Sequence, residues 1–381
     1  MKLLFDFISL QGSINGGAEY TRRVLDELLQ KKQSKLFSIV GLYDSTQAFI
    51  MNEKNKYEKD IEDWIDINCY NNICDITTSQ HFDVFFIGIF QNYMKYNLNG
   101  IQCKVVVVIH DIASVEIQNS RLYLLKPESK KQILKNYIKA ILRKFSNRYK
   151  EYDKDFVSHK DFLLNMTTHI VTVSYFSEKS IKYNIPFLKN KDIHVLYAPL
   201  RKIVQPAIET KVKELLDTNK KYFLILSSKR WLKNADMALE VIYRFSIDHP
   251  DYYVVTTGSK YSAFKNQIAL SYINENQLAY VLKNATALIY PTLMEGFGYP
   301  PIESMCYGVP VLSSGMASLP EILGEDSIYF SPFYKCDLYD KLNQFVKMDY
   351  PKLKKKSLER YRIIKEKQEQ DLQELLKLII Q

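Results

Sequence analysis

Short apolar runs alternate along this chain with longer segments whose apolar residues recur at helical spacing. In residues 18–29, for example, Val24, Leu25, Leu28 and Leu29 share one helical face. Continuous apolar strands that alternate with amphipathic helices are typical of parallel sheets covered by helices on both faces. The predicted strands are Lys2–Phe7, Phe37–Tyr43, Asp83–Ile89, Lys104–His110, His169–Val173 and Ile193–Tyr197, followed by Tyr222–Ser227, Tyr252–Thr257, Ala287–Tyr290 and Val309–Ser313.

The two series of strands are separated by residues 198–219, which contain Pro199, Pro206 and many charged residues. We place the link between two Rossmann-like α/β domains there. The predicted domains are residues 1–199 and 200–355, followed by a C-terminal helix, 356–381, that could cross back. Open α/β sheets bind ligands at the carboxyl ends of their strands, so we expect the two domains to face a cleft between them.

The composition excludes several classes of protein. With 46% hydrophobic and 25% charged residues, the chain of 381 residues has the make-up of a globular protein. No apolar run approaches the ~18 residues that span a bilayer. The first residues place Asp6 inside an apolar run without a cleavage site of small residues, so we expect a buried strand there. Five scattered cysteines favour free thiols in the cytoplasm, and we expect no metal site.

The net charge of +9 is concentrated in one segment. Residues 121–160 contain 12 Lys and Arg against four Asp and Glu, and residues 129–149 predict an amphipathic helix with a basic face. One interpretation is a helix that packs on the core and leaves its basic face in water. The other is peripheral docking on the inner face of an anionic membrane, where a lipid-linked substrate would lie. We recognise no nucleic-acid-binding module.

The most distinctive segment follows the predicted strand Ala287–Tyr290. A turn containing EGFG at residues 295–298 leads through two prolines into a helix that we expect to begin at Ile302. The glycines let a ligand approach the backbone, and a helix N-terminus attracts phosphate. The Glu295 and Glu303 carboxylates can accept hydrogen bonds from sugar hydroxyls, although a glutamate in a first helical turn often only complements the helix dipole.

Residues 285–332 resemble the donor-binding region of retaining family-4 glycosyltransferases of the GT-B fold. The hallmark of that family is a pair of glutamates separated by seven residues, as Glu295 and Glu303 are. The resemblance implies that Glu295 contacts the donor sugar and Glu303 the nucleotide ribose. It also implies that the amides of Gly296, Phe297 and Gly298 lie near the sugar and the phosphate, and that transfer retains the anomeric configuration without a metal or other cofactor.

A second match to the family is SSKRWLKN at residues 227–234. Lys233 and Asn234 match a Lys-Asn pair, and the resemblance implies that Lys233 neutralises the donor diphosphate in place of a metal. The alternative is a solvated lysine at a helix start. The arginine that the family carries earlier in this pattern is missing, because Ser227 and Ser228 stand there, and Arg230 could substitute from a shifted position.

The amino-side domain carries weaker matches. Gly16 and Gly17, just before the helix that we expect from residue 18, resemble a Gly-Gly loop that lies against the donor phosphate or the acceptor; alone, such a pair is often only a turn. His110 and Asp111 lie at the end of an apolar strand, and the resemblance implies that His110 borders the reacting sugar. We take His110, Asp111, Lys233 and Glu295 as the catalytic candidates.

We therefore expect a glycosyltransferase that moves a sugar from a nucleotide-sugar donor to a saccharide or lipid-linked saccharide acceptor in surface polysaccharide synthesis. Two alternatives stay open. A nucleotide-sugar epimerase shares the GT-B architecture, although the spacing of the two glutamates argues against it. A catalytically silent relative that only binds the donor would also fit the missing arginine. The donor base, the sugar and the acceptor do not follow from the sequence.

Overall fold

A computed structural model of the chain describes residues 1–12, 15–32, 37–50, 53–120, 122, 154–201, 204, 206, 207, 213, 216, 221–259, 261–325 and 327–381. These residues form two compact units. The first unit contains Met1–Ser120, the described part of Ile138–Arg201, and Lys367–Gln381. The second contains the described parts of Arg121–Tyr137 and Lys202–Glu366. The predicted basic helix at residues 129–149 lies outside the described residues.

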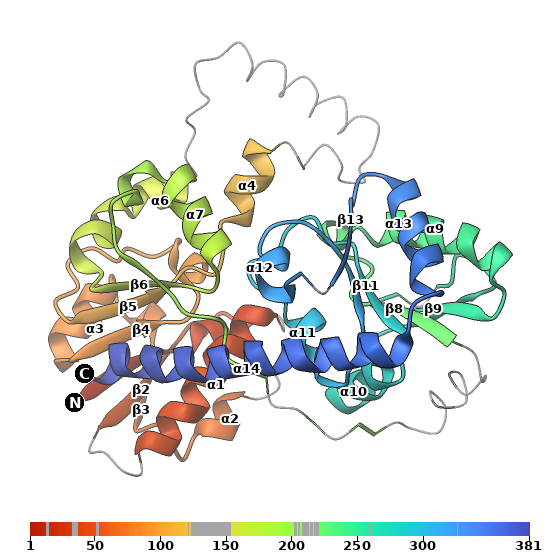
Figure 1. The fold of residues 1–381 in the computed structure, drawn as a ribbon. Helices are drawn as coiled ribbons and strands as arrows, with labels where there is room; N and C mark the ends of the chain where they lie inside the picture. The colour runs from red at the N-terminus through yellow and green to blue at the C-terminus, as the bar shows by residue number, and fades with distance from the viewer. Residues whose placement is uncertain are drawn as a thin grey trace. The chain divides into compact units, whose positions relative to one another are not determined.

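The first unit is built on a parallel sheet of seven strands in the order β3-β2-β1-β4-β5-β6-β7. Its strands are β1 Lys2–Asp6, β2 Ser38–Tyr43, β3 Asp63–Asp66, β4 Val84–Ile87, β5 Lys104–Val108, β6 His169–Thr172 and β7 Ile193–Val195. Its α-helices, which flank the sheet in Figure 1, are α1 Gly16–Lys32, α2 Glu53–Tyr57, α3 Ile73–Gln80, α4 Ala113–Asn119, α6 Lys154–Ser158 and α7 Tyr175–Asn184.

The second unit is built on a parallel sheet of six strands in the order β10-β9-β8-β11-β12-β13. Its strands are β8 Lys221–Ile225, β9 Tyr252–Thr257, β10 Gln267–Leu270, β11 Ala287–Tyr290, β12 Val311–Ser314 and β13 Ile328–Phe330. Its helices are the short turn η8 Trp231–Lys233 and α9 Ala235–Asp248, α10 Glu275–Lys283, α11 Tyr299–Cys306, α12 Leu319–Leu323 and α13 Lys335–Phe345.

Two separate apolar cores explain why the central strands read as continuous apolar runs. In the first unit, Val105 and Val107 of β5 pack with Phe85 of β4 and Ile170 of β6. In the second unit, Phe223 of β8 packs with residues of β9, β11 and α9, and stacks on Tyr252 at a ring-centre distance of 5.2 Å. Because helices cover both faces of a parallel sheet, almost every residue of a central strand is buried. The expected α/β fold with two Rossmann-like domains is confirmed.

The last helix, α14, runs from Tyr350 to Ile380. Its residues to Glu366 belong to the second unit and those from Lys367 to the first. In the second unit, Arg360 donates hydrogen bonds to the carbonyls of Ile322 and Glu321 at 2.8 and 2.6 Å. In the first unit, Gln368 donates to the carbonyl of Ala198 at 2.6 Å. The helix is therefore tied to each unit by contacts at a separate stretch of its length.

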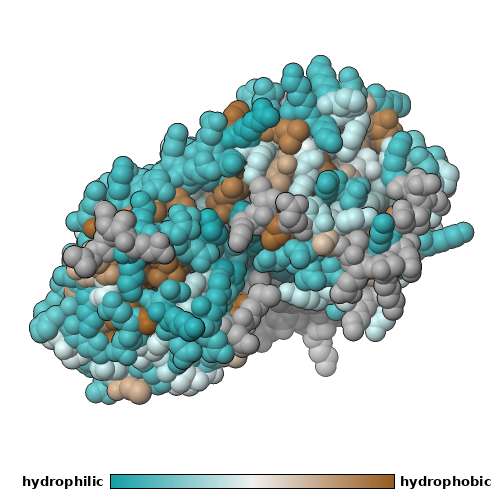
Figure 2. Space-filling view, turned by 90° about the horizontal axis from the view of Figure 1, so that it is seen from below, coloured by the Kyte–Doolittle hydropathy of each residue, from teal (hydrophilic) through white to brown (hydrophobic). Residues whose placement is uncertain are grey.

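The surface in Figure 2 is mostly hydrophilic, and its apolar residues lie in small separate groups. No helix in the described part of the chain combines the length and the apolar character needed to cross a bilayer.

Candidate functional site

Lys233 is held at the carboxyl end of β8 by a turn with two left-handed residues. Ser227 has φ 54° and Asn234 has φ 50°. The Ser227 amide donates to Thr257 Oγ1 at 3.0 Å, and the Ser228 amide donates to the Thr257 carbonyl at 2.9 Å. These bonds tie the turn to the end of β9. The short helix η8 then directs Lys233 inward, so that the residue is 7% exposed.

Lys233 is paired with Glu295 across the end of the sheet. Its ammonium group donates one hydrogen bond to Glu295 Oε1 and another to the Tyr290 hydroxyl at 2.6 Å. Thr292 Oγ1 also bonds to Glu295 Oε1, at 3.2 Å. An ammonium group has three N–H donors, so one donor of Lys233 remains beyond these two contacts. Neither contact to Glu295 uses its Oε2.

The turn that carries Glu295 is fixed to its surroundings by hydrogen bonds to its backbone. The buried Ser318 hydroxyl lies 3.1 Å from the Glu295 carbonyl and 3.2 Å from the Phe297 carbonyl. Upstream, the Leu293 amide donates to the Leu232 carbonyl at 2.8 Å, and Thr292 Oγ1, whose one hydrogen is shared among neighbouring acceptors, lies 3.0 Å from the same carbonyl, so this turn is joined to the Lys233 turn. The ion pair therefore connects two loops that the backbone already holds together.

The helix after this turn begins earlier than the sequence suggested. α11 starts at Tyr299, and Gly298 before it has φ 104°, a conformation that favours glycine. Pro300 and Pro301 therefore lie inside the first turn, where a helical N–H has no partner within the helix. They have no N–H group, so the first turn offers a ligand fewer amides than expected. Glu303 lies beyond the first turn, so its role is not simply to complement the helix dipole there.

Tyr290, the last residue of β11, is a site residue that we did not predict. Its side chain is buried, and burial raises the pKa of its hydroxyl well above the usual value, with the charges of Glu295 and Glu303 acting in the same direction and Arg230 opposing them. The Lys233 ammonium also lies 4.5 Å from the centre of its ring. Lys233 therefore contacts this phenol directly, and the charges of Glu295, Glu303 and Arg230 act on it. The signal was available, because a tyrosine ended an otherwise aliphatic strand.

The remaining predicted residues of this unit have distinct surroundings. Arg230 is exposed. The Asn234 side chain donates to the Pro332 carbonyl at 2.9 Å, which ties the start of α9 to the segment after β13. Gly296, Phe297 and Gly298 are buried within the turn.

In the first unit, His110 follows β5 and is half-buried. Its Nε2 lies 2.9 Å from the Gly88 carbonyl, so Nε2 carries the hydrogen and Nδ1 is left as an acceptor. Burial lowers the pKa of His110 to about 4, and the Gly88 hydrogen bond only partly opposes this effect. The Tyr20 ring contacts the imidazole edge to face at 4.7 Å. His110 is therefore a neutral hydrogen-bonding group at pH 7.

Asp111 and the glycine pair have local structural roles. Asp111 Oδ1 accepts the Ala113 amide at 2.9 Å at the start of α4. Gly16 and Gly17 lie inside the first turn of α1 rather than before the helix. A Cβ atom on Gly17 would lie 2.5 Å from Ile89 Cδ1, so this glycine allows α1 to pack closely on the segment after β4.

The segment after β4 is anchored by a buried carboxylate at the end of β1. Asp6 is fully buried and accepts the amides of Gly88 at 2.9 Å and Ile89 at 3.4 Å. It also accepts the Tyr93 hydroxyl at 2.8 Å and both donors of Ser9. Burial raises the pKa of Asp6, and these hydrogen bonds oppose that rise. The same Gly88 whose amide Asp6 binds accepts the His110 imidazole.

Comparison with known proteins identifies the domain that contains Lys233 and Glu295. Residues 207–370 match the family Glycosyl transferases group 1. The chain is 29% identical over 188 residues to the O-antigen chain mannosyltransferase RfbU of Salmonella typhimurium, which covers 45% of this chain and 50% of that protein. It is 40% identical over 63 residues to O-antigen chain mannosyltransferase B of Escherichia coli, 16% of each chain. The chain thus spans half the length of the first of these relatives and a smaller share of the second.

Solved structures share the fold over nearly the whole chain. Sucrose-phosphate synthase of Thermosynechococcus elongatus superposes with a TM-score of 0.66 at 12% identity, covering 99% of this chain and 98% of that one. The HepE protein of Anabaena, solved with UDP-glucose, gives a TM-score of 0.64 at 12% identity, with 99% and 100% covered. In the described residues, no three His, Cys, Asp or Glu side chains lie close enough to hold a metal ion.

Proposed function

We propose, from the premise that residues 207–370 are a Glycosyl transferases group 1 domain, that this protein transfers a hexose from a nucleoside diphosphate sugar to a saccharide acceptor. The similarity to O-antigen mannosyltransferases favours mannose as the sugar and a surface polysaccharide as the product. We propose that residues 200–355 hold the donor and residues 1–199 the acceptor.

One observation carries this proposal: the Lys233–Glu295 pair leaves one donor and one acceptor for a ligand. The third N–H of Lys233 suits a diphosphate oxygen, and Glu295 Oε2 suits a sugar hydroxyl. A nucleoside diphosphate sugar presents these two groups next to each other at its anomeric carbon. The ion pair thus supports a donor site in which Lys233 binds the leaving diphosphate and Glu295 binds the sugar.

The chemistry follows from the charges. Cleavage of the bond between the anomeric carbon and the diphosphate oxygen builds negative charge on the phosphate and positive charge on the sugar. Lys233 stabilises the first, with Arg230 as a second cation nearby, and the Glu295 carboxylate stabilises the second. Glu303 binds the ribose. We propose that His110, neutral with Nδ1 as acceptor, holds a sugar hydroxyl from the first unit, and that the product retains the anomeric configuration.

Two more detailed proposals concern the chemical nature of the acceptor and the place where the reaction occurs. We propose a lipid-linked saccharide at the inner face of a membrane, approached through the basic residues 121–160. Vesicles with anionic lipids should then bind the protein more strongly than neutral vesicles, and 0.5 M salt should abolish the difference. Equal binding to both vesicles would contradict this part of the proposal alone.

A panel of nucleotide sugars tests the donor proposal. GDP-mannose, UDP-glucose and the free nucleotides are added to the purified protein, and the melting temperature and release of nucleoside diphosphate are measured. We expect one nucleotide sugar to raise the melting temperature and to be hydrolysed slowly, and Glu295→Ala to abolish hydrolysis. Isomerisation of the donor sugar without release of nucleotide would instead indicate an epimerase, and binding without any turnover a silent relative.

A further inference from the structure

A buried phenol holds the Lys233 ammonium group together with Glu295. Tyr290 ends β11 at the carboxyl edge of the sheet, and it is only 1% exposed. Lys233 Nζ donates to the phenol oxygen at 2.6 Å and to Glu295 Oε1. The Lys233 side chain is itself 9% exposed, so protein groups replace most of the water around the ammonium group.

The hydrogen of the Tyr290 phenol points away from Lys233. An ammonium group has no lone pair and can only donate, so the phenol hydrogen is left for another acceptor. That acceptor is the Glu295 carboxylate. Burial raises the pKa of Tyr290 well above its usual value, and the charge of Glu295 and this hydrogen bond act in the same direction, so the phenol keeps its hydrogen. Each of the three side chains is therefore bonded to the other two.

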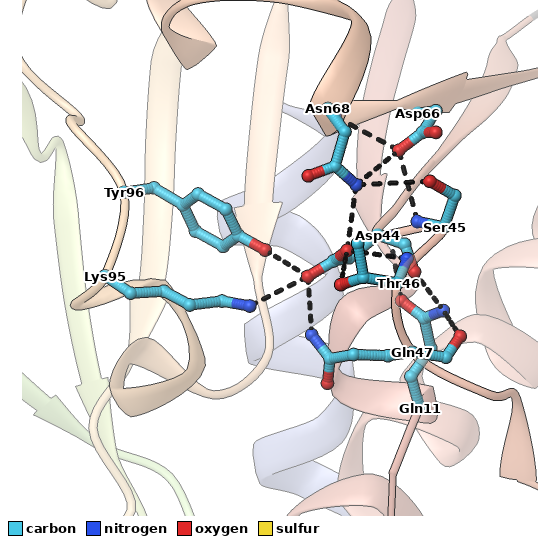
Figure 3. Close-up of polar contacts among 9 residues, drawn as sticks. All are labelled: Gln11, Asp44, Ser45, Thr46, Gln47, Asp66, Asn68, Lys95 and Tyr96. Carbon is cyan, nitrogen blue, oxygen red and sulfur yellow. Dashed lines mark hydrogen bonds and ion pairs between the residues drawn. The ribbon is translucent and has the colours of Figure 1, made fainter.

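The first unit contains the same three kinds of group in a different arrangement (Figure 3). Lys95 Nζ and the Tyr96 hydroxyl each donate to Asp44 Oδ2 at 2.7 Å. The Asp44 carboxylate also accepts donors from three other neighbours, Thr46, Gln47 and Asn68. Lys95 itself is 54% exposed. In that cluster the carboxylate is the centre and the lysine faces water, whereas in the second unit the lysine is buried and both partners are bonded to it.

The two partners determine the direction of the Lys233 ammonium group. An ammonium group is a point charge on a flexible stem, and its three N–H groups rotate freely unless they are bonded. Glu295 alone would fix one N–H and leave rotation about that bond. The phenol oxygen of Tyr290 fixes a second N–H, and the direction of the third then follows from the geometry of the group.

We propose that Tyr290 is a positioning residue of the transfer, which directs the third N–H of Lys233 at the leaving diphosphate. The assignment rests on the proposed function. Other groups of the donor site also hold the nucleotide sugar in the ground state, so donor binding depends little on this one N–H. Negative charge grows on the diphosphate in the transition state, and a misdirected N–H stabilises it less. Loss of the phenol oxygen should therefore slow the reaction more than it weakens donor binding.

Tyr290→Phe tests this inference, because it removes the phenol oxygen and keeps the ring. Release of GDP from GDP-mannose, or of nucleotide from whichever nucleotide sugar the donor panel selects, is measured over a range of donor concentrations. We expect kcat to fall about 10-fold while KM stays within about 2-fold of the wild-type value, the pattern of an interaction made in the transition state. An unchanged kcat, or a raised KM at unchanged kcat, would overturn the inference.

Tyr222→Phe is the matched control. Tyr222 is a buried tyrosine near the amino end of β8, and its hydroxyl donates to the Val281 carbonyl at 2.7 Å. Both variants lose the hydrogen bonds of a buried phenol and should lower the melting temperature by a few degrees. Only Tyr290→Phe should lower kcat. An equal loss of kcat in Tyr222→Phe would mean that reduced stability explains the effect.

A double variant shows whether Tyr290 acts through Lys233. If it does, Tyr290→Phe should lower kcat no further once Lys233→Met is present, because the group that it directs has gone. A second fall of about 10-fold would show that the phenol acts on its own or only supports the fold, and would contradict the positioning role.

Nitrogen NMR of the lysine ammonium groups tests the inference without turnover. The Lys233 signal, assigned by its loss in Lys233→Met, should exchange slowly with water in wild type and in Tyr222→Phe, and faster in Tyr290→Phe. Fast exchange in wild type would overturn the inference even if Tyr290→Phe does not fold. Slow exchange in a protein that turns over no nucleotide sugar would keep the hold of Tyr290 on Lys233 and overturn the proposed function. Turnover with a kcat insensitive to Tyr290→Phe would do the reverse.

Discussion

The two units present opposite kinds of polar chemistry at the carboxyl ends of their sheets. The second unit places a charged pair there, Lys233 with Glu295, in contact with a buried phenol. The first unit also has carboxylates there, but Asp6 and Asp111 accept backbone amides, and the His110 imidazole beside them is neutral because burial lowers its pKa to about 4. A leaving phosphate needs positive charge, whereas a sugar hydroxyl needs oriented hydrogen-bond partners. The proposed function assigns the donor to the second unit and the acceptor to the first, and this contrast is the reason for that assignment.

The largest expected effect comes from breaking the charged pair. Lys233→Met should lower transfer about 10³-fold and destabilise the protein by about 3 kcal/mol, because it leaves the partly buried Glu295 carboxylate without its partner. The rate of nucleotide release and the free energy of unfolding measure the two effects. Lys229→Met, an exposed lysine in the same turn, is the control and should change neither.

The double variant Lys233→Met with Glu295→Gln separates stability from function. Replacing both charges should recover about 2 kcal/mol of the lost stability, since no unpaired carboxylate remains. Transfer should stay as low as in the single variant. Recovery of activity together with stability would mean that the pair only supports the fold.

The titration of His110 tests whether the imidazole in the first unit is neutral at pH 7. Its folded pKa of about 4 lies below the unfolded value of ~6.5. The stability that this difference contributes is therefore present above pH 6.5 and is lost as the pH falls towards 4. Nitrogen-detected NMR should show the Nε2–H form at pH 7 and protonation near pH 4. Between pH 6.5 and 4, His110→Gln should lose less stability than wild type; an equal loss would show that His110 does not titrate in this way.

A smaller effect is expected where the first unit packs most tightly. Gly17→Ala places a methyl group 2.5 Å from Ile89 Cδ1 and should destabilise the protein by about 1–2 kcal/mol. Ile89→Val removes that Cδ1 atom, so combining the two should recover part of the loss. A thermal melt of each variant measures this. Absence of coupling between the two sites would argue against close packing as the reason for this glycine.

The smallest effect concerns Ser227, which carries a side chain in a left-handed backbone conformation. A φ of 54° costs a residue with a side chain about 1 kcal/mol, and glycine at this position would remove that cost. Glycine also has more conformational freedom in the unfolded state, which cancels part of the gain in stability. Ser227→Gly should therefore raise stability by about 0.5 kcal/mol without changing donor binding. Ser228→Gly, at the neighbouring position, should not stabilise the protein. A loss of stability in Ser227→Gly would contradict the strain argument.

The central strands could be predicted from the sequence, and the edge strands mostly could not. All ten predicted strands are present with ends shifted by a few residues. The three that were missed, β3, β10 and β13, each lie at an edge of a sheet. An edge strand is covered on fewer sides, so its residues are partly exposed, as in Asp63–Asp66, and the apolar run that marks a buried strand is absent.

Only those site residues that belong to a recognisable sequence motif could be predicted. Lys233, Glu295 and Glu303 stand in recognisable motifs, and the structure pairs Lys233 with Glu295 and with Tyr290. The ion pair between Lys233 and Glu295 was not predicted, because 61 residues separate them and the contact depends on two loops at one sheet edge.

The Gly88–Ile89 segment also has a consequence for how the chain is made. The groups that hold it, Asp6 and Gly17, precede it in the sequence, whereas His110, which it binds, follows. During synthesis from the amino end, Asp6, Gly17 and the Gly88–Ile89 segment are therefore made before His110. The Gly88 carbonyl, which selects the imidazole tautomer by accepting its Nε2 hydrogen, thus precedes the histidine in the order of synthesis.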